Sequence, residues 1–156
     1  MAEPREIPLP CEFEMEKLVI MLDEVLASDV TVIDGAVAKM MALIEQSGCW
    51  DDSENIDLAL REALANAIIH GNHSNPAKAV RVCVVLQPGC NLLIIVKDAG
   101  AGFDPSQLPN PVLGQQLFSD HGRGIFLINR LMEDVHFSFD HGTTIHMRRA
   151  VAKRTD

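Results

Sequence analysis

The sequence predicts an α+β fold in which helices cover one face of a mainly antiparallel sheet. Two pairs of short apolar runs, each pair separated by turn-forming residues, predict two hairpins. Three longer stretches with apolar residues at helical spacing predict three helices. The chain has 156 residues, 47% of them hydrophobic, so we expect one compact core. We divide it into an N-terminal arm (residues 1–27), a folded domain (28–150) and a basic tail (151–156).

The arm is punctuated by proline at its start, and its segment 17–22 could form an edge strand. The first helix should follow and run to about Gln46, because Gly48 is typical of the position just beyond a helix end. Three residues near its start are candidate caps, since their side-chain oxygens can accept from free backbone N–H groups: Ser28, Asp29 and Thr31.

The second helix, expected over Leu58–Asn72, should be almost entirely buried and yet carries three polar side chains. Glu62, Asn66 and His70 follow one another at four-residue steps and therefore lie along one face. A carboxylate and a carboxamide are costly to bury without partners, which favours a face directed at a ligand. Periodicity alone favours the alternative, a polar outer stripe on an ordinary amphipathic helix.

The remaining elements are two hairpins with a helix between them. Residues 80–86 and 92–96 are β-branched runs on either side of a Pro-Gly turn. Both of their faces are apolar, so this hairpin should lie in the middle of the sheet. Residues 122–132 return to helical spacing, and residues 135–139 and 143–147 flank an Asp-His-Gly turn that predicts the second hairpin.

Two glycine pairs lie at the ends of these elements. Asp98 follows a buried strand, and Gly100 and Gly102 after it would let the backbone approach a ligand closely. Gly122 and Gly124 open the third helix, where free N–H groups can bind phosphate. Neither pair has the spacing of a Walker loop or a Rossmann fingerprint. The polar, proline-rich stretch between the two pairs predicts a mobile flap over the bound group.

Charge and composition narrow the class of partner. The formal net charge of −9 argues against nucleic acid, which needs clustered lysine and arginine. No run approaches the roughly 18 apolar residues of a membrane helix, and the acidic, proline-rich start does not resemble a signal peptide. We therefore expect a cytoplasmic protein without membrane contact. The cysteines form no close pair and are interpreted as reduced thiols: Cys11, Cys49, Cys83 and Cys90.

Four motifs, taken together and in this order, resemble those of the GHKL ATPase superfamily. They are the N box Glu62-x-x-x-Asn66, the glycine boxes Asp98-x-Gly100-x-Gly102 and Gly122-x-Gly124, and the last motif Gly142-Thr143-Thr144. The resemblance spans about residues 30–148. It implies the Bergerat fold, a two-layer α/β sandwich that binds ATP between helices and sheet, and it favours the ligand-facing interpretation of the second helix.

Within that superfamily the sequence is most similar to the anti-sigma factor serine kinases. The run EALANAIIHGN, the third helix GRGIFLINRLMEDV and the GTT hairpin all resemble that branch. The resemblance implies a protein serine kinase that uses ATP and Mg²⁺ and acts as an anti-sigma factor. Its implied partners are a sigma factor, which it binds, and a STAS-type antagonist, which it phosphorylates. It also implies a homodimer.

The resemblance implies a role for each motif residue. Glu62 would be the catalytic residue that orients or deprotonates the attacking hydroxyl, and Asn66 would bind Mg²⁺. Asp98 would accept from the adenine amino group, with help from Thr144. The other implied nucleotide-binding residues are His70, Gly100, Gly102, Gly122, Arg123 and Gly124. Of these, His70 could only line the pocket, and Arg123 could equally be a surface arginine.

Two other functions remain open at this point. The first is a nucleotide-gated binding module that transfers no phosphate, against which Glu62 argues, because a pure binder needs no carboxylate beside the metal ligand. The second is a histidine-kinase catalytic domain detached from its phosphorylatable helix.

Overall fold

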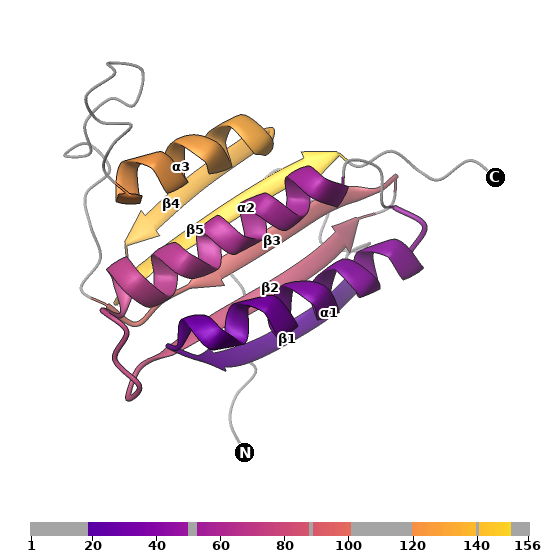
Figure 1. The fold of residues 1–156 in the computed structure, drawn as a ribbon. Helices are drawn as coiled ribbons and strands as arrows, with labels where there is room; N and C mark the ends of the chain where they lie inside the picture. The colour runs from indigo at the N-terminus through magenta and orange to yellow at the C-terminus, as the bar shows by residue number, and fades with distance from the viewer. Residues whose placement is uncertain (1–18, 50–52, 88, 101–119, 140, 151–156) are drawn as a thin grey trace.

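The computed structural model describes residues 19–49, 53–87, 89–100, 120–139 and 141–150. In this part of the chain five strands form one sheet in the order β1-β2-β3-β5-β4, and all neighbouring strands are antiparallel. The strands are β1 (Val19–Ala27), β2 (Ala79–Gln87), β3 (Asn91–Lys97), β4 (Asp134–Phe139) and β5 (Thr143–Ala150). The three α-helices of the described residues lie on one face of the sheet (Figure 1). The expected α+β sandwich is confirmed.

The helices follow the predicted order. They are α1 (Ile33–Gln46), α2 (Ser53–Ala65) and α3 (Asp120–Leu131), and α2 packs between the other two (Figure 1). A 3-10 turn, η2 (Val30–Val32), leads into α1, and it is capped by Asp29, whose carboxylate accepts from the Thr31 N–H at 2.9 Å. Of the three candidate caps, Asp29 therefore holds this position.

The end of α2 departs from an ordinary helix. A π-helical segment, η3 (Asn66–Gly71), continues α2 without a break, and the Asn72 N–H donates to the Ala67 carbonyl at 2.8 Å. Such wide turns are rare and occur often at functional sites. The expected helix over residues 58–72 is thus an α-helix that changes its winding at Asn66.

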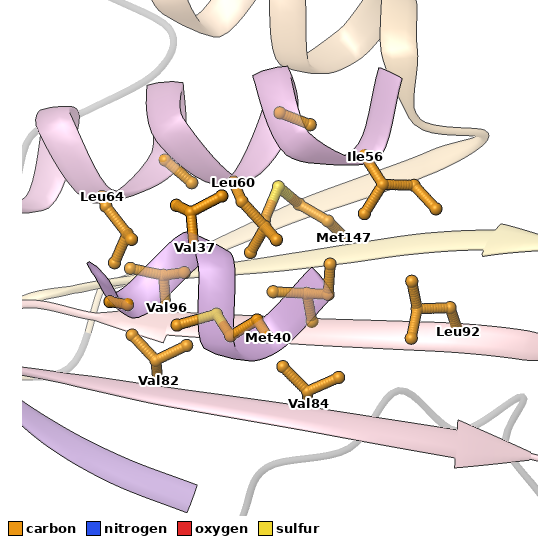
Figure 2. Packing of buried hydrophobic residues seen from close by; sticks show 14 of the residues in the cluster. Val37, Met40, Ile56, Leu60, Leu64, Val82, Val84, Leu92, Val96 and Met147 are labelled. Atoms are coloured by element: carbon orange, nitrogen blue, oxygen red, sulfur yellow. The ribbon is translucent and has the colours of Figure 1, made fainter. Parts of the chain in front are cut away.

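The main core lies between the helices and the sheet (Figure 2). Apolar side chains at helical spacing on α1 and α2 point toward alternate residues of β2, β3 and β5, as period 3.6 and period 2 require. The fully buried members include Val37, Met40, Ile56, Leu60, Leu64, Val82, Val84, Leu92 and Met147. This core fixes where α2 lies above β3 and β5.

The opposite face of the central hairpin is also apolar. Cys83, Val85, Leu93 and Ile95 form a second buried cluster, and their register pairs them across β2 and β3. The expectation of a central hairpin with two apolar faces is therefore confirmed. The possible edge strand over residues 17–22 is confirmed from residue 19 onward, where β1 forms an edge of the sheet and runs to Ala27, and residues 17–18 lie outside the described residues.

One expectation about the cysteines is wrong. Cys49, just after α1, and Cys90, in the turn between β2 and β3, form a disulfide with Cα atoms 5.5 Å apart. These residues are 41 positions apart, so proximity in the sequence could not reveal the pair. Cys83 is a buried free thiol, as expected, and Cys11 lies outside the described residues.

The helices of the described segments are short and amphipathic. None of them combines the length and the apolar character needed to cross a membrane.

Candidate nucleotide-binding site

Asp98 lies at the end of β3 and is held by the backbone of two other segments. Its carboxylate Oδ1 accepts from the N–H groups of Gly100 at 2.9 Å and Thr143 at 3.0 Å. Its own N–H donates to the Thr143 carbonyl at 3.0 Å. The side chain is only 5% exposed. A buried carboxylate held in this way has a fixed direction, which suits it to select one hydrogen-bond donor on a ligand.

Three glycines surround Asp98 at distances that exclude side chains. A Cβ added to Gly71 would lie 2.0 Å from Asp98 Oδ2, and one added to Gly142 would lie 2.3 Å from the Asp98 carbonyl oxygen. A Cβ on Gly100 would lie 1.9 Å from the Gly71 carbonyl oxygen. The end of η3, the start of the first glycine box and the turn before β5 are therefore packed backbone to backbone around one carboxylate.

The second glycine box lies against the N box, where it contacts the side-chain carboxylate and the side-chain amide of that motif. A Cβ added to Gly124 in α3 would lie 2.9 Å from Glu62 Oε2 and 3.3 Å from Asn66 Nδ2. Glu62 is half-buried, and Asn66 is 7% exposed. The structure thus brings together Glu62, Asn66 and Gly124, which the sequence places in two separate helices.

Asn66 carries a polar atom without a partner. Its Nδ2 is buried and makes no hydrogen bond within the described structure. Leaving such a group unpaired costs about 1–3 kcal/mol. The two ends of an amide exchange places by a half-turn of the side chain, so the same position can present an oxygen ligand. An unpaired amide beside a carboxylate and a glycine-opened helix fits a hydrated Mg²⁺ bound to phosphates, since this ion prefers oxygen ligands.

Thr143 is the threonine that lies beside Asp98, and the role expected for its neighbour Thr144 stays a prediction. Side chains alternate along β5, and Ile145 faces the core under the helices, so Thr143 shares that side and Thr144 points to the opposite face. The Thr143 Oγ1 is buried and has no partner among the described residues. The strand alternation in the sequence could have revealed this, because Ile145 and Met147 mark the core face.

The other expected residues are placed only in part. His70 lies half-buried in η3, one turn beyond Asn66. Gly122 and Arg123 fall in the first turn of α3, where the side chain of Arg123 is outside the described structure. Gly102 and residues 105–119 of the expected flap lie outside the described residues too. Gly71, Gly142 and Thr143 also lie against Asp98, and the assignment of nucleotide-binding residues did not include them.

Comparison with known proteins identifies the family. Residues 26–149 match the family model described as the histidine kinase-like ATPase domain. The chain belongs to this family. The match confirms the expected GHKL membership and runs from the end of β1 to Arg149, within the last strand β5.

Individual relatives refine the comparison. The chain is 27% identical over 113 residues to a protein named serine-protein kinase RsbW from Bacillus cereus, and the match covers 67% of this chain and 68% of that protein. A relative with the same name from Bacillus thuringiensis is equally similar. This ATPase domain is thus similar to serine-protein kinases.

Solved structures share the fold at lower identity. A chain with the RsbU and RsbW domains of a Mycobacterium tuberculosis protein matches with a TM-score of 0.58 and 17% identity, over 86% of this chain. The present chain spans about a third of that larger chain, 34%. The mycobacterial sensor histidine kinase MprB matches with a TM-score of 0.51 and 15% identity, over 85% of this chain and 100% of that one. Both likenesses show the fold.

Proposed function

We propose that the protein is a serine kinase that transfers the γ-phosphoryl group of ATP to a protein hydroxyl. The observation that carries the proposal is the meeting of Glu62, Asn66 and Gly124 at one end of a site whose other end is the buried Asp98. Similarity to serine-protein kinases supports the acceptor. A site that only held nucleotide would not need the Glu62 carboxylate beside the phosphates.

Asp98 would bind the adenine ring. Two backbone N–H groups hold its Oδ1, which leaves Oδ2 to accept from the exocyclic amino group of adenine. The unpaired Thr143 hydroxyl would bind the same base edge, directly or through water. In this assignment Thr143 takes the role that the sequence suggested for Thr144.

Glu62 would be the catalytic base. It takes the proton of the serine hydroxyl while the serine oxygen bonds to the γ-phosphorus and the bond from that phosphorus to the β–γ bridging oxygen breaks, so ADP leaves. Asn66 would hold Mg²⁺, which supplies positive charge to the phosphate oxygens. Backbone N–H groups at Gly100, Gly102, Gly122 and Gly124 would bind phosphates, with Arg123 beside them and His70 lining the pocket.

The partners follow from the resemblance to anti-sigma factor kinases. We propose a cytoplasmic anti-sigma factor that binds a sigma factor, phosphorylates a STAS-type antagonist on serine and acts as a homodimer. The antagonist would be released once phosphorylated, and the sigma factor would stay bound. An acidic chain of net charge −9 suits protein partners better than nucleic acid.

The deciding experiment is phosphoryl transfer from γ-labelled Mg-ATP into a lysate of the source cell, with acid stability tested on each labelled band. A small acid-stable band that is absent with Asn66→Ala and with Glu62→Ala is the expected result. Glu62→Ala should still bind ATP, because Glu62 acts on the acceptor and not on the base. An acid-labile band would instead indicate a histidine kinase. No band, with ATP binding intact, would leave a nucleotide-gated binding module.

A further inference from the structure

Asn72, the residue that ends η3, is completely buried and its amide group is fully used. Its Nδ2 donates to the Ser28 Oγ at 2.8 Å and to the Ala79 carbonyl at 3.1 Å. Its Oδ1 accepts from the Ala99 N–H at 2.7 Å. One side chain thus joins the ends of β1 and η3, the start of β2 and the loop after β3.

Ser28 links the Asn72 side chain to the residue just before β2. It is 3% exposed, and its hydroxyl donates to the Lys78 carbonyl at 2.6 Å while accepting from Asn72. This explains why Ser28 does not cap the first helix. The contact between Asn72 and Ala99 is separate from the Ser28 contact, because it uses the other atom of the amide. A change at Ser28 can therefore remove one contact and leave the contact with Ala99 in place.

The Ala99 N–H belongs to the peptide that follows Asp98. Fixing this peptide limits rotation about the Asp98 backbone, and the next residue, Gly100, donates its own N–H to the Asp98 Oδ1. The direction of the Asp98 carboxylate therefore depends on a peptide that Asn72 holds from behind. Asn72 itself is not among the groups that the proposed function places on the nucleotide.

We propose that Asn72 is a positioning residue that sets the preference of the site for adenine over guanine. The inference rests on the proposed function, in which Asp98 accepts from the amino group of adenine. Guanine carries a carbonyl oxygen at the equivalent position, which repels a correctly aimed carboxylate and offers it no proton. A loosely held Asp98 loses its bond to adenine and rejects guanine less, so Asn72 should act on the ratio of the two affinities.

The test compares the dissociation constants of ATP and GTP for the full chain and two variants. Asn72→Ala should weaken ATP binding about tenfold or more and change GTP binding by less than about twofold, because the hydrogen bond from Ala99 that fixes Asp98 is lost together with the bonds to Ser28 and Ala79. Ser28→Ala is the matched control: it removes one of the two contacts of the Asn72 Nδ2, leaves the contact with Ala99, and should lower thermal stability while keeping the ratio of ATP to GTP affinity. Equal ratios in the wild type and Asn72→Ala would overturn the proposal, as would equal losses in both variants.

A second measurement does not depend on a folded variant or on nucleotide. Hydrogen exchange of the Ala99 amide in the wild type, without ligand, should be slowed at least about a hundredfold relative to an unstructured amide. Exchange at the unstructured rate would overturn the proposal even if Asn72→Ala did not fold. If the wild type bound neither ATP nor GTP, the proposed function would fail, and the adenine preference would fail with it. A protected Ala99 amide would in that case still show that the hydrogen bond from Ala99 to Asn72 is present.

Discussion

At the scale of the residue, Gly71 shows how the Asp98 carboxylate leaves no space for a side chain at a neighbouring position. It lies in a helical segment whose backbone any residue can adopt, so glycine is not required there for conformation. It is required for space, because an added Cβ would lie 2.0 Å from Asp98 Oδ2 and 2.3 Å from Asp98 Cγ. The absence of a side chain at Gly71 is part of what gives Asp98 its position.

We predict that Gly71→Ala lowers ATP affinity at least about tenfold, since the methyl group must displace the Asp98 carboxylate. Isothermal titration calorimetry measures the effect. Gly35→Ala is the control, because Gly35 lies inside α1 with nothing within 4 Å of an added Cβ. That change should leave ATP affinity unaltered and raise the free energy of unfolding by about 0.5–1 kcal/mol. Wild-type ATP affinity in Gly71→Ala would contradict the prediction.

Gly124→Ala should act on catalysis more than on binding. The added Cβ would lie 2.9 Å from Glu62 Oε2, so the end of the Glu62 side chain must move away from its place. We expect kcat for phosphoryl transfer to fall about 10- to 100-fold, with a smaller change in the Kd for ATP. Rapid-quench kinetics and equilibrium binding separate the two effects. Loss of ATP binding with an unchanged kcat would show that Gly124 serves the nucleotide and not Glu62.

At the scale of the element, the disulfide between Cys49 and Cys90 joins the end of α1 to the β2–β3 turn. A loop of 41 residues closed in this way lowers the entropy of the unfolded chain, which stabilises the fold by about 4 kcal/mol in the chain-entropy account. Disulfides are rare in the cytoplasm, where the two cysteines would be held as thiols. The free energy of unfolding therefore depends on whether the surroundings of the protein keep this pair oxidised or reduced.

We predict that reduction lowers the free energy of unfolding by up to about 4 kcal/mol. Urea unfolding with and without dithiothreitol measures it, and Cys49→Ala with Cys90→Ala should show the reduced midpoint under both conditions. A midpoint that ignores dithiothreitol in the wild type would contradict the prediction.

Counting thiols tests the same pairing chemically. Burial raises the pKa of the Cys83 thiol to about 11, so little thiolate forms near neutral pH and reagents should modify it slowly in the native state. Of the four cysteines, Cys11→Ser removes one. In that variant we expect one titratable thiol after unfolding, from Cys83, and three after unfolding with reduction. Three thiols without reduction would mean that the disulfide is absent.

At the scale of the whole molecule, β1 forms one edge of the sheet and is joined to β2 by an ion pair. The Arg81 guanidinium donates to both carboxylate oxygens of Asp23, at 2.9 and 2.8 Å. These hydrogen bonds hold the pKa of Asp23 below its usual value, with a smaller opposing effect of burial. A lowered pKa in the folded state stabilises the protein at neutral pH, and that contribution is lost as the pH falls below about 4.

We predict that Asp23→Asn reduces the loss of stability on acidification. The pair is partly exposed, so its contribution should not exceed about 1 kcal/mol. Urea midpoints at pH 7 and near pH 3 for wild type and variant measure it. The variant should be less stable than the wild type at pH 7 and should approach it at low pH, and a constant difference at both pH values would contradict the assignment.

Much of this architecture could be predicted from the sequence, because its signals are local. The two hairpins were predicted from β-branched runs around turns, and the helices from spacing and caps such as Asp29. The helix that carries Glu62 and Asn66 was placed correctly, and the glycine motifs pointed to Asp98.

Other features depend on tertiary contacts that spacing does not encode. The π-helical segment that begins at Asn66 ends against the loop after β3, where Gly71 meets Gly100. Which of Thr143 and Thr144 lies on the helix side of β5 depends on which face of the strand the helices cover. The pairing of Cys49 with Cys90 needs the whole of α2 and β2 to be in place between them.

The strand order has a consequence for how the chain folds during its synthesis. Hairpins β2–β3 and β4–β5 join neighbours in the sequence and can form early. By contrast, β1 pairs with β2 only after both α1 and α2 have been made, since Val19 meets Leu86. While translation proceeds, β1 therefore leaves the ribosome as an unpaired strand, which opens it to chaperones and to self-association.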